Sequence, residues 1–135
     1  MSVNIQNWSG HHAFSATTFH QPESVEQLQE VVSRSRKVKV IGARHSFNNI
    51  ADSTDTIISL EKLDQTPTID PVNMTVTVSG DITYGRLCQQ LHAAGYSIHN
   101  MASLPHITIA GAISTATHGS GDTNGNLATA VAAIE

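Results

Sequence analysis

The chain has 135 residues, which is about the size of one domain and short for an enzyme with separate cofactor and substrate domains. Hydrophobic residues make up 39% of it and charged residues 13%, a composition that excludes extended disorder. Seven Lys and Arg stand against eleven Asp and Glu, and the net charge of -4 leaves no basic surface for nucleic acid. We therefore expect a soluble globular domain, or part of one, without a nucleic-acid partner.

The cysteine and histidine content restricts metal and redox chemistry. Cys88 is the single cysteine, so the chain can form neither an internal disulfide nor a multi-cysteine metal site. The eight histidines are scattered apart from His11 and His12, and none forms the i, i+4 pair of a helical zinc site, so we expect no metal. The N-terminus has no signal-peptide pattern and no apolar stretch is long enough to span a membrane, which favours a cytoplasmic protein without membrane contact.

Capping and periodicity signals predict the elements in chain order. Trp8 and Phe14 are expected to anchor the polar segment before the first helix. Ser24 has Gln27 three residues later, the capping-box pattern of a helix start, and Gly95 stands where a left-handed helix end belongs. Alternating apolar and β-branched residues indicate strands. The expected order is a helix from residue 24, strands over 37–41 and 56–60, a hairpin of strands 66–70 and 75–79, a helix over 83–94 that makes Cys88 a core residue, and a strand over 96–100.

The last third of the chain has a different character. Residues 101–126 consist largely of Gly, Ala, Ser, Thr and His with almost no charge, and we expect a long functional loop there. Residues 127–135 are apolar again and end without a turn. A strand at that place would leave an unfinished sheet edge, which indicates a truncated domain and a possible homo-oligomer contact through the edge. A short helix there would remove the difficulty.

Two glycine-containing segments are the candidates for chemistry. They are GARHSFN at residues 42–48 and ASLPHITIAGAISTATHGSG at residues 102–121, and each follows a predicted strand, so a parallel or mixed sheet could bring both to one edge. Glycines would let backbone N–H groups approach a pyrophosphate, and Ser46, Ser114 and Thr115 would add hydroxyl donors. The ordinary dinucleotide and nucleoside triphosphate fingerprints are both absent. A phosphate-containing cofactor would therefore be bound by another scheme.

Spaced motifs identify a family resemblance. They are Asn7-Trp8-Ser9-Gly10, the helix start Pro22–Leu28, Gly42–Asn48, and Ser103–His106 through Ala110-Gly111 to Thr117–Gly121. Together they resemble the PCMH-type FAD-binding domain of the vanillyl-alcohol oxidase superfamily, and within it most closely the alditol (xylitol) oxidases. The loop is similar to the alditol oxidase pattern Gly-x-Arg-His-Ser-Phe-Asn, whereas aldonolactone oxidases usually show Gly-x-Gly-His-Ser, so Arg44 discriminates between them. Ala43, where Thr is common, and His11-His12 depart from the family pattern.

The resemblance implies a fold and a set of site residues. The fold is α+β, a small mixed sheet with flanking helices, with residues 1–135 forming the N-terminal part of an FAD-binding domain that lacks its substrate-capping domain. His45 would be joined covalently to the 8α-methyl group of FAD, kept deprotonated by Arg44, as a single link because no cysteine stands in the second segment. Ser103 would lie near flavin and substrate. The remaining implied cofactor contacts are Ile41, Gly42, Ala43, Arg44, Ser46, Thr108, Gly111, Ala112, Ile113, Ser114, His118 and Gly119.

The implied reaction oxidises the primary alcohol of a polyol to an aldehyde, with FAD accepting hydride and oxygen becoming hydrogen peroxide. The catalytic groups would belong to the capping domain, so no catalytic residue is expected among residues 1–135. Two alternatives stay open. The chain could be the FAD domain of an aldonolactone oxidase, or a non-catalytic folded fragment that binds no flavin. Taken alone, His45 could also be a turn imidazole that caps a carbonyl, and His106 and His118 could pack their loops.

Overall fold

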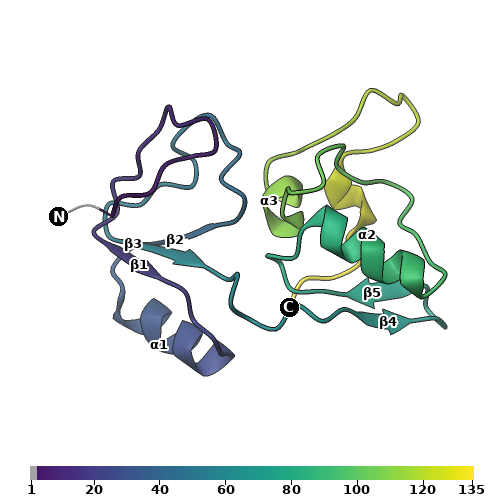
Figure 1. The fold of residues 1–135 in the computed structure, drawn as a ribbon, viewed down its shortest axis with the longest axis horizontal. Helices are drawn as coiled ribbons and strands as arrows, with labels where there is room; N and C mark the ends of the chain where they lie inside the picture. The colour runs from purple at the N-terminus through teal and green to yellow at the C-terminus, as the bar shows by residue number, and fades with distance from the viewer. Residues whose placement is uncertain (1–2) are drawn as a thin grey trace. The chain divides into compact units, whose positions relative to one another are not determined.

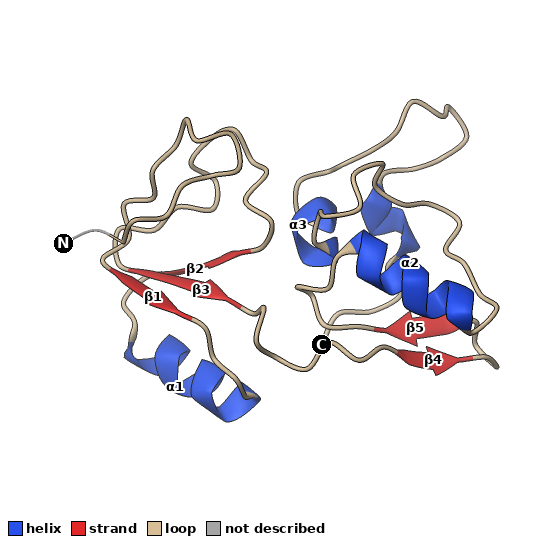
Figure 2. Ribbon diagram, in the orientation of Figure 1, coloured by secondary structure: helices blue, strands red, loops and turns tan. Residues whose placement is uncertain are grey.

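The computed structural model describes residues 3–135, which form two compact units divided between Asp64 and Gln65 (Figure 1). Short helices and two small sheets make up the regular structure (Figure 2). The predicted α+β class is therefore confirmed. Strands of both senses are present, but they lie in two separate sheets, one parallel and one antiparallel.

The first unit is built on a parallel sheet with the order β1-β3-β2. Its strands are β1 (Thr18–His20), β2 (Val38–Ile41) and β3 (Thr56–Ser59), and the helix α1 (Val25–Arg34) connects β1 to β2 (Figure 1). All four residues of β3 are buried because a strand pairs with it on each side. The predicted helix start is confirmed, since the Ser24 side chain accepts the backbone N–H of Gln27. The core of this unit consists of Phe14, Ala16, Ile41 and Ile57.

The second unit begins with the predicted hairpin, β4 (Thr68–Asp70) and β5 (Thr75–Thr77), which pair antiparallel. The helix α2 (Tyr84–Ala93) lies beside this hairpin (Figure 1). Its buried Leu87 and Leu91 belong to the same apolar cluster as residues of the hairpin. Gly95 has a φ of 81°, so the left-handed helix end expected there is confirmed. Cys88 on α2 is only partly buried and lies outside the buried clusters, with its Sγ 3.6 Å from the Met101 Sδ, so the expected core position is corrected.

Two sequence-based expectations about the second unit are wrong, and the choice between strand and short helix at residues 127–135 is decided for the helix. Residues 96–100 form no strand, because the Tyr96 N–H turns back to the Leu91 carbonyl and closes α2. The expected long loop contains a helix of its own, α3 (Ile109–Ile113), which begins at Thr108. Residues 127–135 also form no strand: Leu127–Ala130 is the 3-10 helix η1, and irregular chain follows it. The possible oligomer contact at this end of the chain stays a prediction.

Trp8 is also placed differently from the expectation. Phe14 is buried at 4% exposure and anchors the first core, whereas Trp8 is 62% exposed. A tryptophan contributes little to a core from that position, so its contacts lie elsewhere. In the part of the chain that the structure describes, no helix combines the length and apolar character needed to cross a membrane.

Candidate functional site

The first candidate segment leaves the parallel sheet at the carboxyl end of β2. Ile41 is the last residue of that strand, and its buried side chain packs with Phe14 and Ile57. Its side chain is therefore a core group that fixes where the loop starts. Gly42 follows directly, and residues 42–48 contain no helix or strand. Ligand sites in parallel sheets form at this end of the strands, and the loop has the corresponding place in the first unit.

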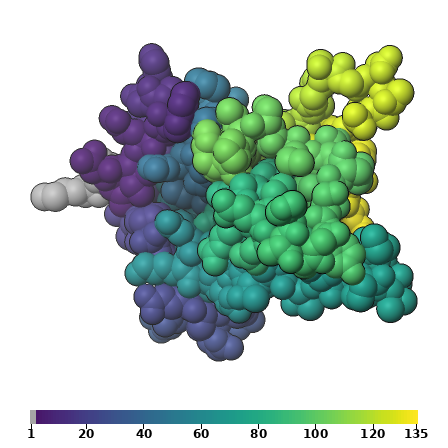
Figure 3. All heavy atoms as spheres, turned by 45° about the vertical axis from the view of Figure 1, so that its right-hand side comes forward, coloured from purple at the N-terminus to yellow at the C-terminus, as the bar shows by residue number. Residues whose placement is uncertain are grey.

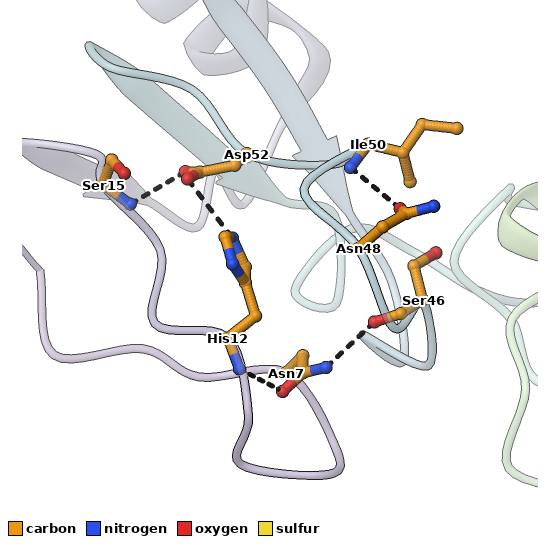
Figure 4. Close-up of polar contacts among 7 residues, drawn as sticks. All are labelled: Asn7, His12, Ser15, Ser46, Asn48, Ile50 and Asp52. Atoms are coloured by element: carbon orange, nitrogen blue, oxygen red, sulfur yellow. Dashed lines mark hydrogen bonds and ion pairs between the residues drawn. The ribbon is translucent and has the colours of Figure 1, made fainter.

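Residues 6–8 hold this loop on both sides of His45. The backbone N–H of Trp8 donates to the Arg44 carbonyl at 2.9 Å, and the Asn7 side-chain Nδ2 donates to the Ser46 carbonyl at 3.0 Å (Figure 4). The Arg44 guanidinium in turn donates to the Gln6 carbonyl at 3.1 Å. The loop and the N-terminal segment are thus joined by three hydrogen bonds, each within ordinary length.

His45 lies against the indole of Trp8. The two ring centroids are 4.6 Å apart and the ring planes differ by 21°, which is a stacked arrangement. The preceding residue, Arg44, has a φ of 59°, a left-handed backbone conformation that residues other than glycine rarely adopt. The strained residue and the stacked ring are adjacent in the chain. The backbone turn at Arg44 therefore directs the imidazole of His45 toward the indole.

The Asn7 carboxamide is the centre of the polar contacts around the loop (Figure 4). The residue is 5% exposed. Its Oδ1 accepts the His12 N–H at 3.0 Å, while its Nδ2 donates to the Ser9 hydroxyl and to the Ser46 carbonyl, each at 3.0 Å. Both ends of the amide are used, as burial of a polar group requires. This network fixes the path of the N-terminal segment under the loop.

His12 and Asp52 form a second polar pair beside this network (Figure 4). The His12 Nε2 lies 3.3 Å from the Asp52 Oδ2, and the Ser15 N–H donates to the Asp52 Oδ1 at 2.8 Å. Burial acts most strongly on the pKa of Asp52 and raises it, but hydrogen bonds from Ser15 and Ser53 and the charge of His12 outweigh burial, so the pKa lies below its usual value. Asp52 therefore stabilises the unit as a carboxylate.

Sequence reasoning left several of these groups out of the site. Asn7 enters the sequence analysis only within a family motif, Trp8 only in that motif and as an expected anchor, and no role is predicted there for His12 or Asp52. Their contacts join residues far apart in the chain, such as Asn7 and Ser46, which are 39 positions apart. A signal was nevertheless present in the sequence, since an Asn-Trp pair so near the N-terminus was part of the spaced pattern.

The loop has backbone groups suited to an anionic cofactor. The backbone N–H groups of Ala43 and Ser46 donate to no other residue of the described chain, and both residues are half-buried. Backbone N–H groups in a glycine-containing turn are suitable donors for phosphate oxygens. The backbone can therefore come close to a pyrophosphate at Gly42, Ala43 and Ser46, and His45 lies in the same segment.

In the second unit, the helix α3 and its two capping residues, Thr108 and Ser114, include five of the eight predicted residues. Thr108 is 6% exposed and precedes the helix, and its backbone forms a bridge with Thr83. A Cβ on Gly111 would lie 2.8 Å from the Thr108 Oγ1, so a larger residue there would require the Thr108 side chain to move. Ala112 is 1% exposed and packs with Tyr84 and other apolar residues of this core. The side chain of Ala112 is thus a structural group, and its backbone N–H is already bonded to the Thr108 carbonyl.

The remaining predicted residues of this unit lie at its surface. Ile113 and Ser114 line an open pocket of about 520 Å³ together with Ala128 and residues 131–134. Ser103, His118 and Gly119 are exposed, and the segment around residues 118–125 projects from the unit (Figure 3). The His118 Nδ1 lies 3.0 Å from the Gly119 carbonyl. That the segments 42–48 and 102–121 share one edge stays a prediction. Across residues 3–135, no three His, Cys, Asp or Glu side chains are grouped as a metal site would need.

These features define an α+β domain with a backbone-lined loop suited to an anionic cofactor. Residues 16–135 match the FAD binding domain family, and the chain belongs to that family. The match extends over most of the first unit and all of the second. Membership in this family supports FAD as the cofactor, although the chain lacks the ordinary dinucleotide fingerprint.

Several known oxidases resemble the chain along most or all of its length. It is 42% identical to the alditol oxidase of Streptomyces sp. (strain IKD472 / FERM P-14339) over 100% of the chain and 33% of that protein. It is 33% identical to the L-gulonolactone oxidase of Mus musculus over 98% of the chain and 31% of that protein. It is 30% identical to the D-arabinono-1,4-lactone oxidase of Yarrowia lipolytica (strain CLIB 122 / E 150) over 85% of the chain and 23% of that protein. The chain thus spans a third or less of the length of these relatives.

The charge of Asp52 gives a pH-dependent contribution to stability. Because the folded-state pKa is lowered, the contribution is present above the unfolded value of about 3.9 and is lost as the pH falls through the folded value. We expect Asp52→Asn to lower the free energy of unfolding by about 1 kcal/mol at pH 7 and by much less at pH 3. Urea unfolding at both pH values measures this. Asp122→Asn, at an exposed turn position, is the control, and an equal loss for Asp52→Asn at both pH values would contradict the assignment.

The left-handed backbone at Arg44 predicts which variants at this position are more stable. Arg44→Gly and Arg44→Ala both lose the hydrogen bond to Gln6, but glycine adopts a φ of 59° without strain and alanine does not. We expect the alanine variant to be less stable than the glycine variant by about 1 kcal/mol. Chemical denaturation of the two proteins side by side is the measurement. Equal stability would mean that the turn at residue 44 is not left-handed in solution.

Proposed function

We propose that the chain is the FAD-binding part of an alditol oxidase similar to xylitol oxidases. Such an enzyme oxidises a primary alcohol of a polyol to an aldehyde and reduces oxygen to hydrogen peroxide. The observation that carries this proposal is the 42% identity to an alditol oxidase over the entire chain, with Arg44 and His45 in the loop. The relatives named for lactone oxidation are 33% and 30% identical. The small-molecule partners proposed are therefore a polyol and oxygen, in the cytoplasm.

We propose that His45 carries the cofactor covalently, through a bond from a ring nitrogen to the 8α carbon of FAD. Support comes from the stacking that fixes the imidazole and from the hydrogen bonds on both sides of the residue. In forming that bond, His45 gives up its ring proton and takes the place of one hydrogen on the 8α carbon. The two protons and two electrons released reduce one oxygen molecule to hydrogen peroxide. When bound, FAD would accept a hydride from the alcohol carbon of the substrate.

The other residues of the proposed site hold the cofactor by backbone contacts. Ala43 and Ser46 would donate their N–H groups to the pyrophosphate of FAD. From the second unit, Gly111, Ile113, Ser114 and Gly119 would contact FAD, with Ser103 near the substrate. Thr108 is the residue before α3, and its hydroxyl lies where a Cβ on Gly111 would be placed. Proton transfer from the polyol would belong to residues outside this chain.

The aldonolactone oxidases are the second candidate within the family. Glycine at position 44 of their pattern would suit the left-handed backbone that Arg44 adopts here, so the same turn is available to both groups. Arg44 instead reaches the Gln6 carbonyl with its guanidinium. This contact favours the alditol oxidase reading, because a glycine could not make it. A folded fragment that binds no flavin is the third reading.

The attachment site is tested by the intact mass of the purified chain. We expect an added mass of one FAD, located by peptide mapping to the peptide that contains His45. His45→Ala should remove that added mass, and His99→Ala, at an exposed bend, should keep it. A bare mass for the unmodified chain, with FAD supplied during expression, would favour the fragment that holds no flavin.

The substrate class is tested on the full-length gene product by hydrogen peroxide release. We expect kcat/KM for xylitol to exceed that for L-gulono-1,4-lactone by at least about tenfold, which corresponds to about 1.4 kcal/mol of transition-state discrimination. A polyol without a terminal primary alcohol serves as the matched control substrate. A preference for the lactone would identify an aldonolactone oxidase instead.

A further inference from the structure

The contacts between residues 6–8 and the loop surround a single residue, His45. The carbonyl before His45 accepts the Trp8 N–H, the carbonyl after it accepts the Asn7 Nδ2, and the imidazole itself lies on the Trp8 ring. A backbone held on both sides and a ring held on one face leave little freedom to the imidazole.

We propose that Trp8 is a positioning residue that fixes the orientation of the His45 imidazole and thereby sets the rate of its covalent attachment to FAD. The proposal rests on the function proposed above. Trp8 does not react, and it acts only through His45. Asn7 and the Trp8 N–H hold the backbone, while the indole determines the plane in which the imidazole nitrogens point.

The exposure of Trp8 supports this role. The residue is 62% exposed and packs in none of the buried clusters, so core stability does not explain a large aromatic side chain there. Stacking does explain it, because the flat indole ring lies against the imidazole, with the two ring centroids 4.6 Å apart. Attachment requires the ring nitrogen and the 8α carbon to meet in a narrow range of geometry, so orientation of one partner raises the rate.

Stacked aromatic pairs contribute enough to make the effect measurable. If loss of the indole releases the imidazole, attachment should slow by about two- to tenfold, as expected for the loss of one aromatic pair. The bond itself is unchanged: His45 loses its ring proton, replaces one hydrogen of the 8α-methyl group, and oxygen takes the two electrons. Trp8 changes only how often the nitrogen is correctly directed.

The orientation is tested first without flavin. Trp8 is the only tryptophan of the 135-residue chain, so its emission reports on the stack alone. A protonated imidazole in contact with indole quenches its fluorescence, so the emission should fall as acidification protonates the imidazole. His45→Gln should abolish this change, and His11→Gln and His12→Gln, the other histidines nearby in sequence, should retain it. The same pH response in the His45→Gln variant would overturn the proposal.

The rate is tested next by following FAD uptake by mass. Chain produced in a riboflavin-starved host is mixed with FAD, and the attached fraction is measured over time. Trp8→Leu should slow attachment by about two- to tenfold, and Trp8→Phe, which keeps an aromatic face, should restore most of the rate. Phe19→Leu, at a partly exposed aromatic residue of the same unit, is the control and should leave the rate unchanged.

The outcomes separate this proposal from the proposed function. A Trp8→Leu variant that attaches FAD as fast as the unmodified chain would overturn the positioning role while the covalent flavin stands. An unmodified chain that attaches no FAD would overturn the proposed function and, with it, the effect of Trp8 on the rate. In that case the pH-dependent emission still decides whether Trp8 orients His45.

Discussion

The pairing of β3 with a parallel strand on each side is the constraint on which the first unit depends. Burial of all four β3 residues fixes the register of β1 and β2, and Ile41 at the end of β2 is held in the same core as Ile57. The loop that begins at Gly42 therefore leaves a rigid edge. Rigid strands that present a flexible loop at their carboxyl ends are the usual way in which open parallel sheets build ligand sites.

Polar contacts then convert that loop into a defined surface. Asn7 uses both ends of its amide, and through Ser46 it connects the N-terminal segment to the residues that follow β2. Asp52 and His12 extend these contacts to the chain that leads into β3. Buried polar groups satisfied in this way determine one arrangement of the backbone, because any shift would leave a donor or acceptor without a partner. The imidazole of His45 inherits its position from this arrangement.

In the second unit, small residues allow close packing within the protein itself. Gly111 lies so close to the Thr108 hydroxyl that a Cβ would displace it, and Ala112 packs inside the core with Leu127. A run of Gly, Ala, Ser and Thr that looks like a loop in the sequence therefore includes a short helix with close contacts on both sides. Small residues permit close approach of neighbouring groups of the protein as well as of a ligand, and composition does not distinguish these two uses.

Local signals in the sequence determined much of this protein. The Ser24 cap, the Gly95 helix end and the alternation in residues 37–41 are short-range patterns, and each predicted its element. The motif around His45 likewise indicated the FAD-binding family. Only the tertiary structure decided that the Trp8 ring lies on His45, that Ala112 is a core residue, and that residues 96–100 and 127–135 form no strand. The reason is physical: these outcomes depend on contacts between distant segments, which no local periodicity encodes.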